Sequence, residues 1–336
     1  MAIKKQLITA FLLIWAGGIQ GALQAEDFYK EAIIIGGYSG KDQWVGKKGS
    51  LKNSVGFEYY RKFSDEYGDF LALDVQMRTA YDSAEDSQDA FGVEIHNAWL
   101  EYKPGLGESI RLGHFDPAFG LEPVLDTHGT LLQTLVGKNI GFKKDWGIGY
   151  KGLLGDYDFQ LVAGLGSGMG LRRKDGSFLL TSRISTPQTK ETQIGLSFMY
   201  GQTLESSQSR TIPADELISE NSIRKKRIGI DFQCPLGIFD FKAEAAAGDN
   251  DGKAVAGGLA EFGYTIPDQQ NLRLKFQTLY WSNDWEEKNA RDLCLSPVVE
   301  YKASSTTTIR LGYFHDIYSS SDEDKMIVLQ FYYFGL

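Results

Sequence analysis

The sequence lacks several features by which common classes of protein are recognised. Its 336 residues include only two cysteines and eight prolines. Two lone cysteines exclude a disulfide-rich scaffold, a zinc ribbon and an iron–sulfur site. Acidic residues outnumber basic ones by 44 to 35, so the basic footprint of a nucleic-acid-binding protein is missing. What the chain has instead is glycine, at 38 residues, and aromatic side chains, at 13% of all residues.

The first 25 residues have the pattern of an export signal. Lys4 and Lys5 precede an apolar run from Leu7 to Ala16, and small residues follow as far as Ala25. The apolar run is shorter than the ~20 residues that a spanning helix needs. We therefore predict a cleaved signal peptide at 1–25 and a mature chain at 26–336. No later segment is apolar and long enough to predict a transmembrane helix.

Apolar and polar residues alternate with a period of two along the mature chain. Leu71, Leu73 and Val75 share one face of a segment, whereas Asp74 and Gln76 share the other. The alternating segments number sixteen, and many approach the ~9–11 residues of a membrane-spanning strand. They are 31–39, 51–63, 69–81, 90–103, 108–115, 142–153, 156–165, 178–186, 190–202, 222–234, 238–248, 254–265, 271–282, 291–302, 305–316 and 325–336.

The connections between these segments alternate between short and long. Short turns on one rim and long polar loops on the other are typical of bacterial outer-membrane barrels. The fold class that we predict is therefore all-β, a transmembrane antiparallel β-barrel of about 16 strands. Fourteen or eighteen strands also fit the pattern. The apolar, aromatic segment from Met326 to Leu336 is expected to close the barrel against the first strand.

The connection after the fifth segment is long and too apolar to stand in solvent. Phe119, Leu121, Leu131 and Leu135 are among the side chains that require burial. We expect residues 116–141 to form a long third loop that folds inward and narrows the lumen. A lid on top of the barrel, or a contact between subunits, is the alternative.

At this point the chain resembles Gram-negative outer-membrane porins. The sequence Ile110-Arg-Leu-Gly-His-Phe-Asp-Pro-Ala-Phe-Gly-Leu-Glu122 is similar to the end of strand five in the phosphate-selective-porin-like branch. The resemblance implies a homotrimer with the third loop as the constriction. Phosphate specificity is not expected, because the loop has no dense cluster of basic residues apart from Lys138, Lys143 and Lys144 near its end.

The selectivity of such a channel depends on charges that face a narrow, wet passage. We predict Asp116, Glu122, Asp126 and His128 as the residues of the constriction loop. The predicted basic residues of the pore wall are Arg78, Arg111, Lys151, Arg183, Arg227, Lys242, Arg273, Lys275 and Arg310. The predicted acidic ones are Glu58, Asp74, Glu94, Asp158, Asp231, Asp240, Glu244, Glu261 and Glu300. The two sets are of equal size, so we expect no strong selectivity, and we expect the loop to lie against Arg111 and Arg183.

The remaining reactive side chains do not indicate catalysis or a cofactor. His96, His114, His128 and His315 lack the spacing of metal ligands, so we predict neither a metal site nor an enzyme. Cys234 and Cys294 are expected near opposite ends of the barrel, too far apart for a disulfide.

The sequence thus predicts passive diffusion of small hydrophilic solutes and ions across the outer membrane. The expected partners are outer-membrane lipids and lipopolysaccharide, with no nucleic acid. Alternatives are a substrate- or anion-selective channel, a barrel that sheathes or displays a partner protein, and a soluble secreted β-protein.

Overall fold

The structure is a computed structural model that describes residues 26–40, 53–81, 91–105, 107–206, 217–287, 290–318 and 324–336. The predicted signal peptide lies outside the described residues. Among the described residues, none forms a helix that is both long and apolar enough to cross a membrane.

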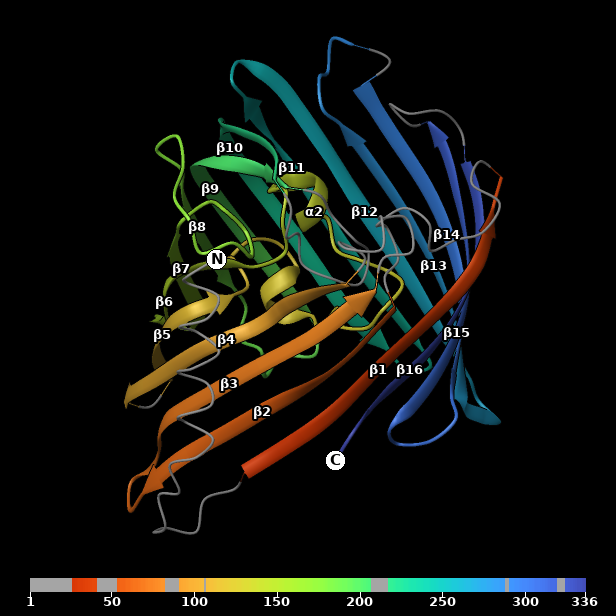
Figure 1. The fold of residues 1–336 in the computed structure, drawn as a ribbon, viewed down its shortest axis with the longest axis horizontal. Coiled ribbons are helices and arrows are strands. Elements are labelled where there is room, and N and C mark those ends of the chain that lie inside the picture. Colours follow the sequence, from red (N-terminus) through yellow and green to blue (C-terminus); the bar gives the residue numbers. More distant parts are fainter. Residues whose placement is uncertain are drawn as a thin grey trace.

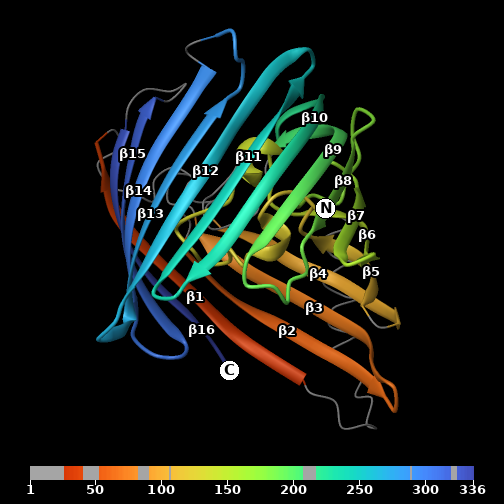
Figure 2. The same ribbon diagram turned by 180° about the vertical axis from the view of Figure 1, so that it is seen from behind.

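Sixteen antiparallel strands form one closed barrel, in which each strand pairs with its neighbours in sequence and β16 pairs with β1 (Figures 1 and 2). The strands are β1 (Glu26–Ser39), β2 (Asn53–Asp65), β3 (Gly68–Tyr81), β4 (Phe91–Gly105), β5 (Glu108–Phe115), β6 (Asp145–Leu154), β7 (Tyr157–Gly164), β8 (Phe178–Ser185), β9 (Gln193–Ser206), β10 (Leu217–Leu236), β11 (Phe239–Asn250), β12 (Lys253–Ile266), β13 (Gln269–Ser282), β14 (Arg291–Lys302), β15 (Thr307–Tyr318) and β16 (Asp324–Gly335). The predicted fold class and strand number are confirmed.

Most predicted strand boundaries agree with the structure to within three residues. The largest differences are at the starts of β1 and β10, where each strand begins five residues earlier than predicted. These extensions mix apolar and polar residues without alternating, so the period of two does not reveal them. They are strands because they pair with the neighbouring strand, β1 down to Glu26 opposite Arg61 and β10 down to Leu217 opposite Ser206.

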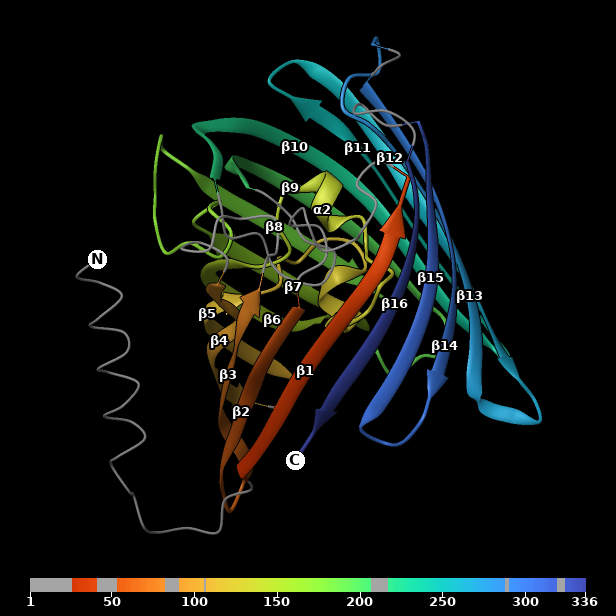
Figure 3. The ribbon, with the colours of Figure 1, turned by 45° about the vertical axis from the view of Figure 1, so that its right-hand side comes forward.

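The final strand closes the barrel as predicted. β16 pairs with β1 from Lys30 opposite Gly335 to Ser39 opposite Met326, and the two strands run side by side in Figure 3. Because β16 pairs with β1, this apolar strand has no free edge that could pair with another chain.

The two faces of the wall differ in composition. Outward-facing side chains such as Leu112, Ile148 and Leu180 are apolar and exposed. Inward-facing ones such as Arg78 and Arg183 are polar and buried. An apolar outer band and a polar interior are the pattern of an outer-membrane barrel, since the bilayer is the solvent for the outer face.

Cys234 on β10 and Cys294 on β14 form no disulfide with each other, as predicted.

Candidate functional site

The connection between β5 and β6, residues 116–144, lies inside the barrel, and we call it the inner loop. It is the yellow segment enclosed by the strands in Figures 1 and 2. It contains a 3-10 turn, η1 (Glu122–Val124), and one turn of helix, α2 (Val136–Asn139). Its ends lie together because Phe115 and Asp145 are paired across β5 and β6. The loop therefore leaves and rejoins the wall at one place and spans the lumen between.

One side of the inner loop forms an apolar core with the barrel wall, and we call this contact the apolar attachment. Its wall residues point inward from β8 to β13, where a porin lumen would be expected to be polar. The loop contributes Phe119, Leu121, Leu135, Val136, Ile140 and Phe142, and the wall contributes Leu179, Met199, Ala246, Val255, Leu259 and Trp281. These inward apolar residues were not predicted, although the burial that the loop requires was.

Backbone hydrogen bonds fix the loop along the same side. The N–H of Ala118 donates to Thr181 Oγ1 at 2.9 Å, and the N–H of Gly120 donates to Ser197 Oγ at 3.0 Å. The N–H of Leu121 donates to Glu244 Oε2 at 3.2 Å. Gly120 has a positive φ of 61°, and a Cβ there would lie 2.1 Å from the Glu244 carboxylate. Glycine therefore permits this close approach of backbone and wall.

The opposite side of the loop is held by a buried polar cluster, which we call the polar attachment. His128 Nε2 lies 2.5 Å from Glu31 Oε1 on β1, and His128 Nδ1 lies 3.0 Å from Arg78 Nη2 on β3. The same guanidinium nitrogen lies 3.0 Å from His96 Nδ1 on β4, and Arg78 Nη1 lies 3.5 Å from Glu31 Oε1. The rings of His96 and His128 are 4.2 Å apart. Burial and the neighbouring Arg78 lower the pKa of His128, against the opposing effect of Glu31.

No pattern in the sequence predicts this grouping of histidines. His96 and His128 lie on different segments, and only the inward fold of the loop brings them together. Within the residues that the structure describes, no group of three potential ligands is arranged to hold a metal ion.

The three predicted loop acids have different surroundings. Asp116 pairs with Lys144 within the loop at 2.5 Å. Glu122 is buried and accepts hydrogen bonds from the hydroxyls of Thr127 and Thr134. Burial, with a contribution from Asp116, raises the pKa of Glu122 to about 7. Burial likewise lowers the pKa of the adjacent Lys143 to about 8.

Asp126 is the exposed member of the predicted acids. Its Oδ1 accepts a hydrogen bond from the N–H of His128 at 2.9 Å, and it lines the cavity described below. Of the three acids, Asp126 therefore has the freest access to a passing solute.

The predicted wall cations all point into the lumen, but most of them pair with neighbours on the wall. We expected Arg183 to lie against the loop. Instead it forms two hydrogen bonds with Asp231 on the wall, at 3.0 and 2.6 Å. Arg111 pairs with Glu101 at 2.5 Å, Arg273 pairs with Asp240, and Lys151 donates to Gln188 at 3.2 Å. Partners on other strands, or in the turn at Gln188, lie within reach at these positions, and the alternation along a single strand does not reveal them.

Three of the predicted cations reach the inner loop. Besides Arg78 in the polar attachment, Arg227 donates to Asn139 Oδ1 at 2.9 Å, and Arg310 donates to the carbonyl of Gly129 at 2.9 Å. On the loop, Arg227 and Arg310 thus bind a side-chain amide and a backbone carbonyl, and not carboxylates.

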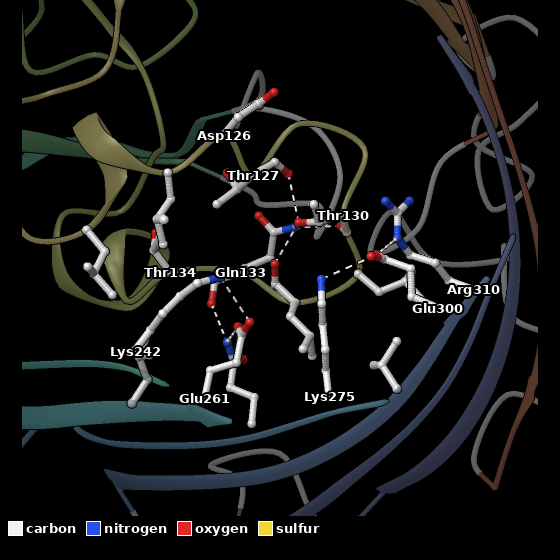
Figure 4. Close-up of a pocket in the computed structure, with 17 residues that line it drawn as sticks. Asp126, Thr127, Thr130, Gln133, Thr134, Lys242, Glu261, Lys275, Glu300 and Arg310 are labelled. Carbon is white, nitrogen blue, oxygen red and sulfur yellow. Dashed lines mark hydrogen bonds and ion pairs between the residues drawn. The ribbon is translucent and has the colours of Figure 1, made fainter. Parts of the chain in front are cut away.

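A cavity of about 100 Å³ remains between the inner loop and strands β11 to β15, and we call it the central cavity (Figure 4). Its loop side is lined by Leu121, Leu125, Asp126, Thr127, Thr130, Leu131, Leu132, Gln133 and Thr134. Its wall side is lined by Lys242, Leu259, Glu261, Lys275, Gln277, Val298, Glu300 and Arg310. Figure 4 shows Lys275 reaching toward Glu300 and Arg310 from the wall, with the threonines and Gln133 opposite.

A second cavity, of about 80 Å³, lies on the other side of the loop against β4 to β7. Arg111 and Asp116 both line it, together with Phe115 and Lys151. The guanidinium of Arg111 lies over the Trp99 ring at 4.1 Å from the ring centroid. Cavities thus lie on two sides of the inner loop.

Comparison with known proteins identifies the fold. No family model matches the chain, and no curated protein matches it. Among solved structures it is similar to OmpF of Salmonella typhi in complex with daunomycin, with a TM-score of 0.64 and 12% identity over 92% of this chain and 97% of that one. It is also similar to an anion-selective porin from Comamonas acidovorans, with a TM-score of 0.63 and 9% identity over 93% and 100% of the two chains.

The trimer form of OmpT, an outer-membrane protein of Vibrio cholerae, is similar at a TM-score of 0.62 and 11% identity, over 93% of this chain and 100% of that one. The fold of this chain is therefore that of the Gram-negative outer-membrane porins.

Proposed function

We propose that the protein is an outer-membrane channel for passive diffusion of small hydrophilic solutes and ions. The observation that carries the proposal is the central cavity, a polar space left open between an inward-folded loop and a charged wall. Charges in such a confined passage are screened less than on an open surface, so they bias what enters. The apolar outer face favours insertion among outer-membrane lipids and lipopolysaccharide, after export directed by residues 1–25.

A barrel that sheathes a partner protein is less well supported. The inner loop contacts β1 and β3 through His128, and β8 to β13 through the apolar attachment. The spaces beside it are far too small for a polypeptide domain. Nothing in the arrangement of the described side chains favours a catalyst or a cofactor over a channel.

The assembly that we propose is a homotrimer. A similar fold is found in the OmpT structure in trimer form, and trimers extracted in detergent should survive unheated electrophoresis. A sedimentation measurement that gives the monomer mass in mild detergent would contradict this part of the proposal.

The channel is tested by recording from the purified protein in planar bilayers, with and without the inner loop. Because Phe115 and Asp145 are paired, residues 117–143 can be replaced by two glycines without moving the strands. We expect a severalfold rise in conductance, of order threefold, because the loop fills most of the lumen. Entry of larger sugars into liposomes should rise with it.

Two single variants test the role of the loop acids. Asp126→Asn should shift the reversal potential toward anions, more so at low salt, because this carboxylate is exposed to the cavity. Asp116→Asn, in which the removed charge is paired with Lys144, is the matched control and should shift it less. If the loop replacement folds yet leaves conductance and size limit unchanged, the inner loop is not the constriction.

A further inference from the structure

The charged side chains that line the central cavity are balanced in sign. Three basic side chains and three acidic ones line it, so the formal charges cancel. The wall charges are also paired directly. Lys242 Nζ lies 3.1 Å from Glu261 Oε1, and Glu300 Oε2 lies 2.6 Å from Arg310 Nε and 3.3 Å from Lys275 Nζ. On the wall an entering ion meets groups that already have partners of opposite sign, whereas Asp126 lines the loop side outside these pairs.

The remaining polar groups of the cavity are neutral and can both donate and accept. Gln277 Nε2 donates to Glu261 Oε2 at 3.1 Å and to the carbonyl of Gln133 at 3.0 Å, so it joins the wall to the loop. Thr127, Thr130 and Thr134 line the loop side in the same space. Hydroxyl groups of a solute can accept from ammonium and amide N–H groups and donate to carboxylate oxygens at once.

Apolar side chains complete the lining. Leu121, Leu131 and Leu259 are buried and line the cavity together with Val298. A carbon skeleton with hydroxyls on its edges can cover such a surface while its hydroxyls reach the polar groups. A small bare ion cannot, and on the wall side it would lose hydration without gaining an unpaired counter-charge.

Resting on the channel proposed above, we propose that the central cavity is a binding subsite for small neutral polyhydroxylated solutes, the polyols and monosaccharides. The solute bridges the Lys242–Glu261 and Lys275–Glu300–Arg310 pairs on the wall and the threonine side of the inner loop. The neutral solute is preferred because it needs no wall pair to be broken.

The experiment compares three probes with the same six-carbon skeleton. Sorbitol is neutral, gluconate is an anion and glucamine is a cation at pH 7. Sorbitol added to one side should reduce the small-ion current through wild-type channels beyond its effect on bulk conductivity. Gluconate and glucamine at equal concentration should block at least about threefold less. The reversal potential in a KCl gradient should give a K⁺/Cl⁻ permeability ratio within about twofold of one.

Two variants remove one member of a wall pair and should move selectivity in opposite directions. Glu300→Gln leaves Lys275 and Arg310 without their shared carboxylate, so the ratio should shift toward anions and gluconate should become the stronger blocker. Lys242→Gln leaves Glu261 without its cation, so the ratio should shift toward cations. Lys151→Gln, on the wall of the second cavity, removes the same charge and should leave the block by sorbitol unchanged.

The outcomes separate the two proposals. A wild-type channel that conducts but is blocked best by gluconate or by glucamine overturns the polyol subsite alone. Block by sorbitol that is equal in Lys151→Gln and in the two cavity variants also overturns it. Wild-type protein that inserts but passes neither ions nor sorbitol overturns the channel itself, and the subsite with it.

Discussion

The two sides of the inner loop are held to the barrel by contacts of opposite character. The apolar attachment buries Phe119, Ile140 and Phe142 against β8 to β13, in a part of the lumen that is packed like a protein core. The polar attachment binds His128 to Glu31 and Arg78 by a few short contacts. Burial of apolar surface involves no proton and so does not depend directly on pH, whereas a histidine paired with a carboxylate depends on protonation. The apolar attachment therefore anchors the loop, and the polar attachment makes the binding of the loop to the wall depend on pH.

The largest expected effect comes from the apolar attachment. Phe119→Ala should lower the free energy of unfolding in detergent by about 3–5 kcal/mol, because a buried ring is lost and a cavity remains. Urea titration followed by tryptophan fluorescence measures it, and single-channel records should show more current noise. Leu125→Ala, at a half-buried position of the same cluster, is the control and should cost less. A loss below about 1 kcal/mol for Phe119→Ala would mean that the core does not anchor the loop.

A smaller effect is expected from the polar attachment. His128→Ala should cost about 1–3 kcal/mol, because it leaves Glu31 and Arg78 buried with fewer partners. A double-mutant cycle with Glu31→Gln measures the coupling directly. Coupling near zero would show that the 2.5 Å contact between His128 and Glu31 contributes nothing to holding the loop.

The smallest effect is expected inside the loop and has the opposite sign. The pKa of Glu122 is raised to about 7 by burial, so the folded state favours the neutral carboxyl. The stability that this protonation contributes is complete below the ordinary pKa of about 4.5 and is lost as the pH rises through 7. Wild-type protein should therefore lose stability between pH 5 and pH 8.

Glu122→Gln, which cannot ionise, should remove this part of the pH dependence and gain on the order of 1 kcal/mol at pH 8. The urea midpoint at both pH values measures the change. Asp116→Asn, which removes a charge that adds to the effect of burial on this pKa, is the comparison and should weaken the pH dependence without removing it. Identical slopes for wild type and Glu122→Gln would show that this carboxyl does not titrate in the interval.

Much of the barrel could be predicted because its signal is local. Whether Asp74 points inward and Leu73 outward follows from alternation along one strand, and the structure confirms it with Asp74 buried. Strand number and closure also followed, because short turns and the apolar last strand are read in the sequence itself. The starts of β1 and β10 were missed because their residues do not alternate, and only pairing with a neighbour shows them to be strands.

The residues of the site could be predicted from the sequence, but the partner of each side chain could not. That the connection after β5 needs burial could be inferred from its apolar residues. The pairing of side chains depends on segments that lie apart in the sequence. Examples are Arg183 with Asp231 and Arg310 with the carbonyl of Gly129. The inward apolar residues Leu179 and Trp281 also look like any others on an alternating strand until the loop packs on them.

The barrel, the facing of its side chains and the apolar loop after β5 can be predicted from the sequence, since each depends on residues close together in the chain. Which wall residues the loop contacts depends on the three-dimensional fold. The hydrogen bond from Leu121 to Glu244 joins residues 123 positions apart, and the contact of His128 with Glu31 joins residues 97 apart. Closure of the barrel brings these groups within hydrogen-bonding distance, and the loop then settles where its apolar and polar sides both find partners.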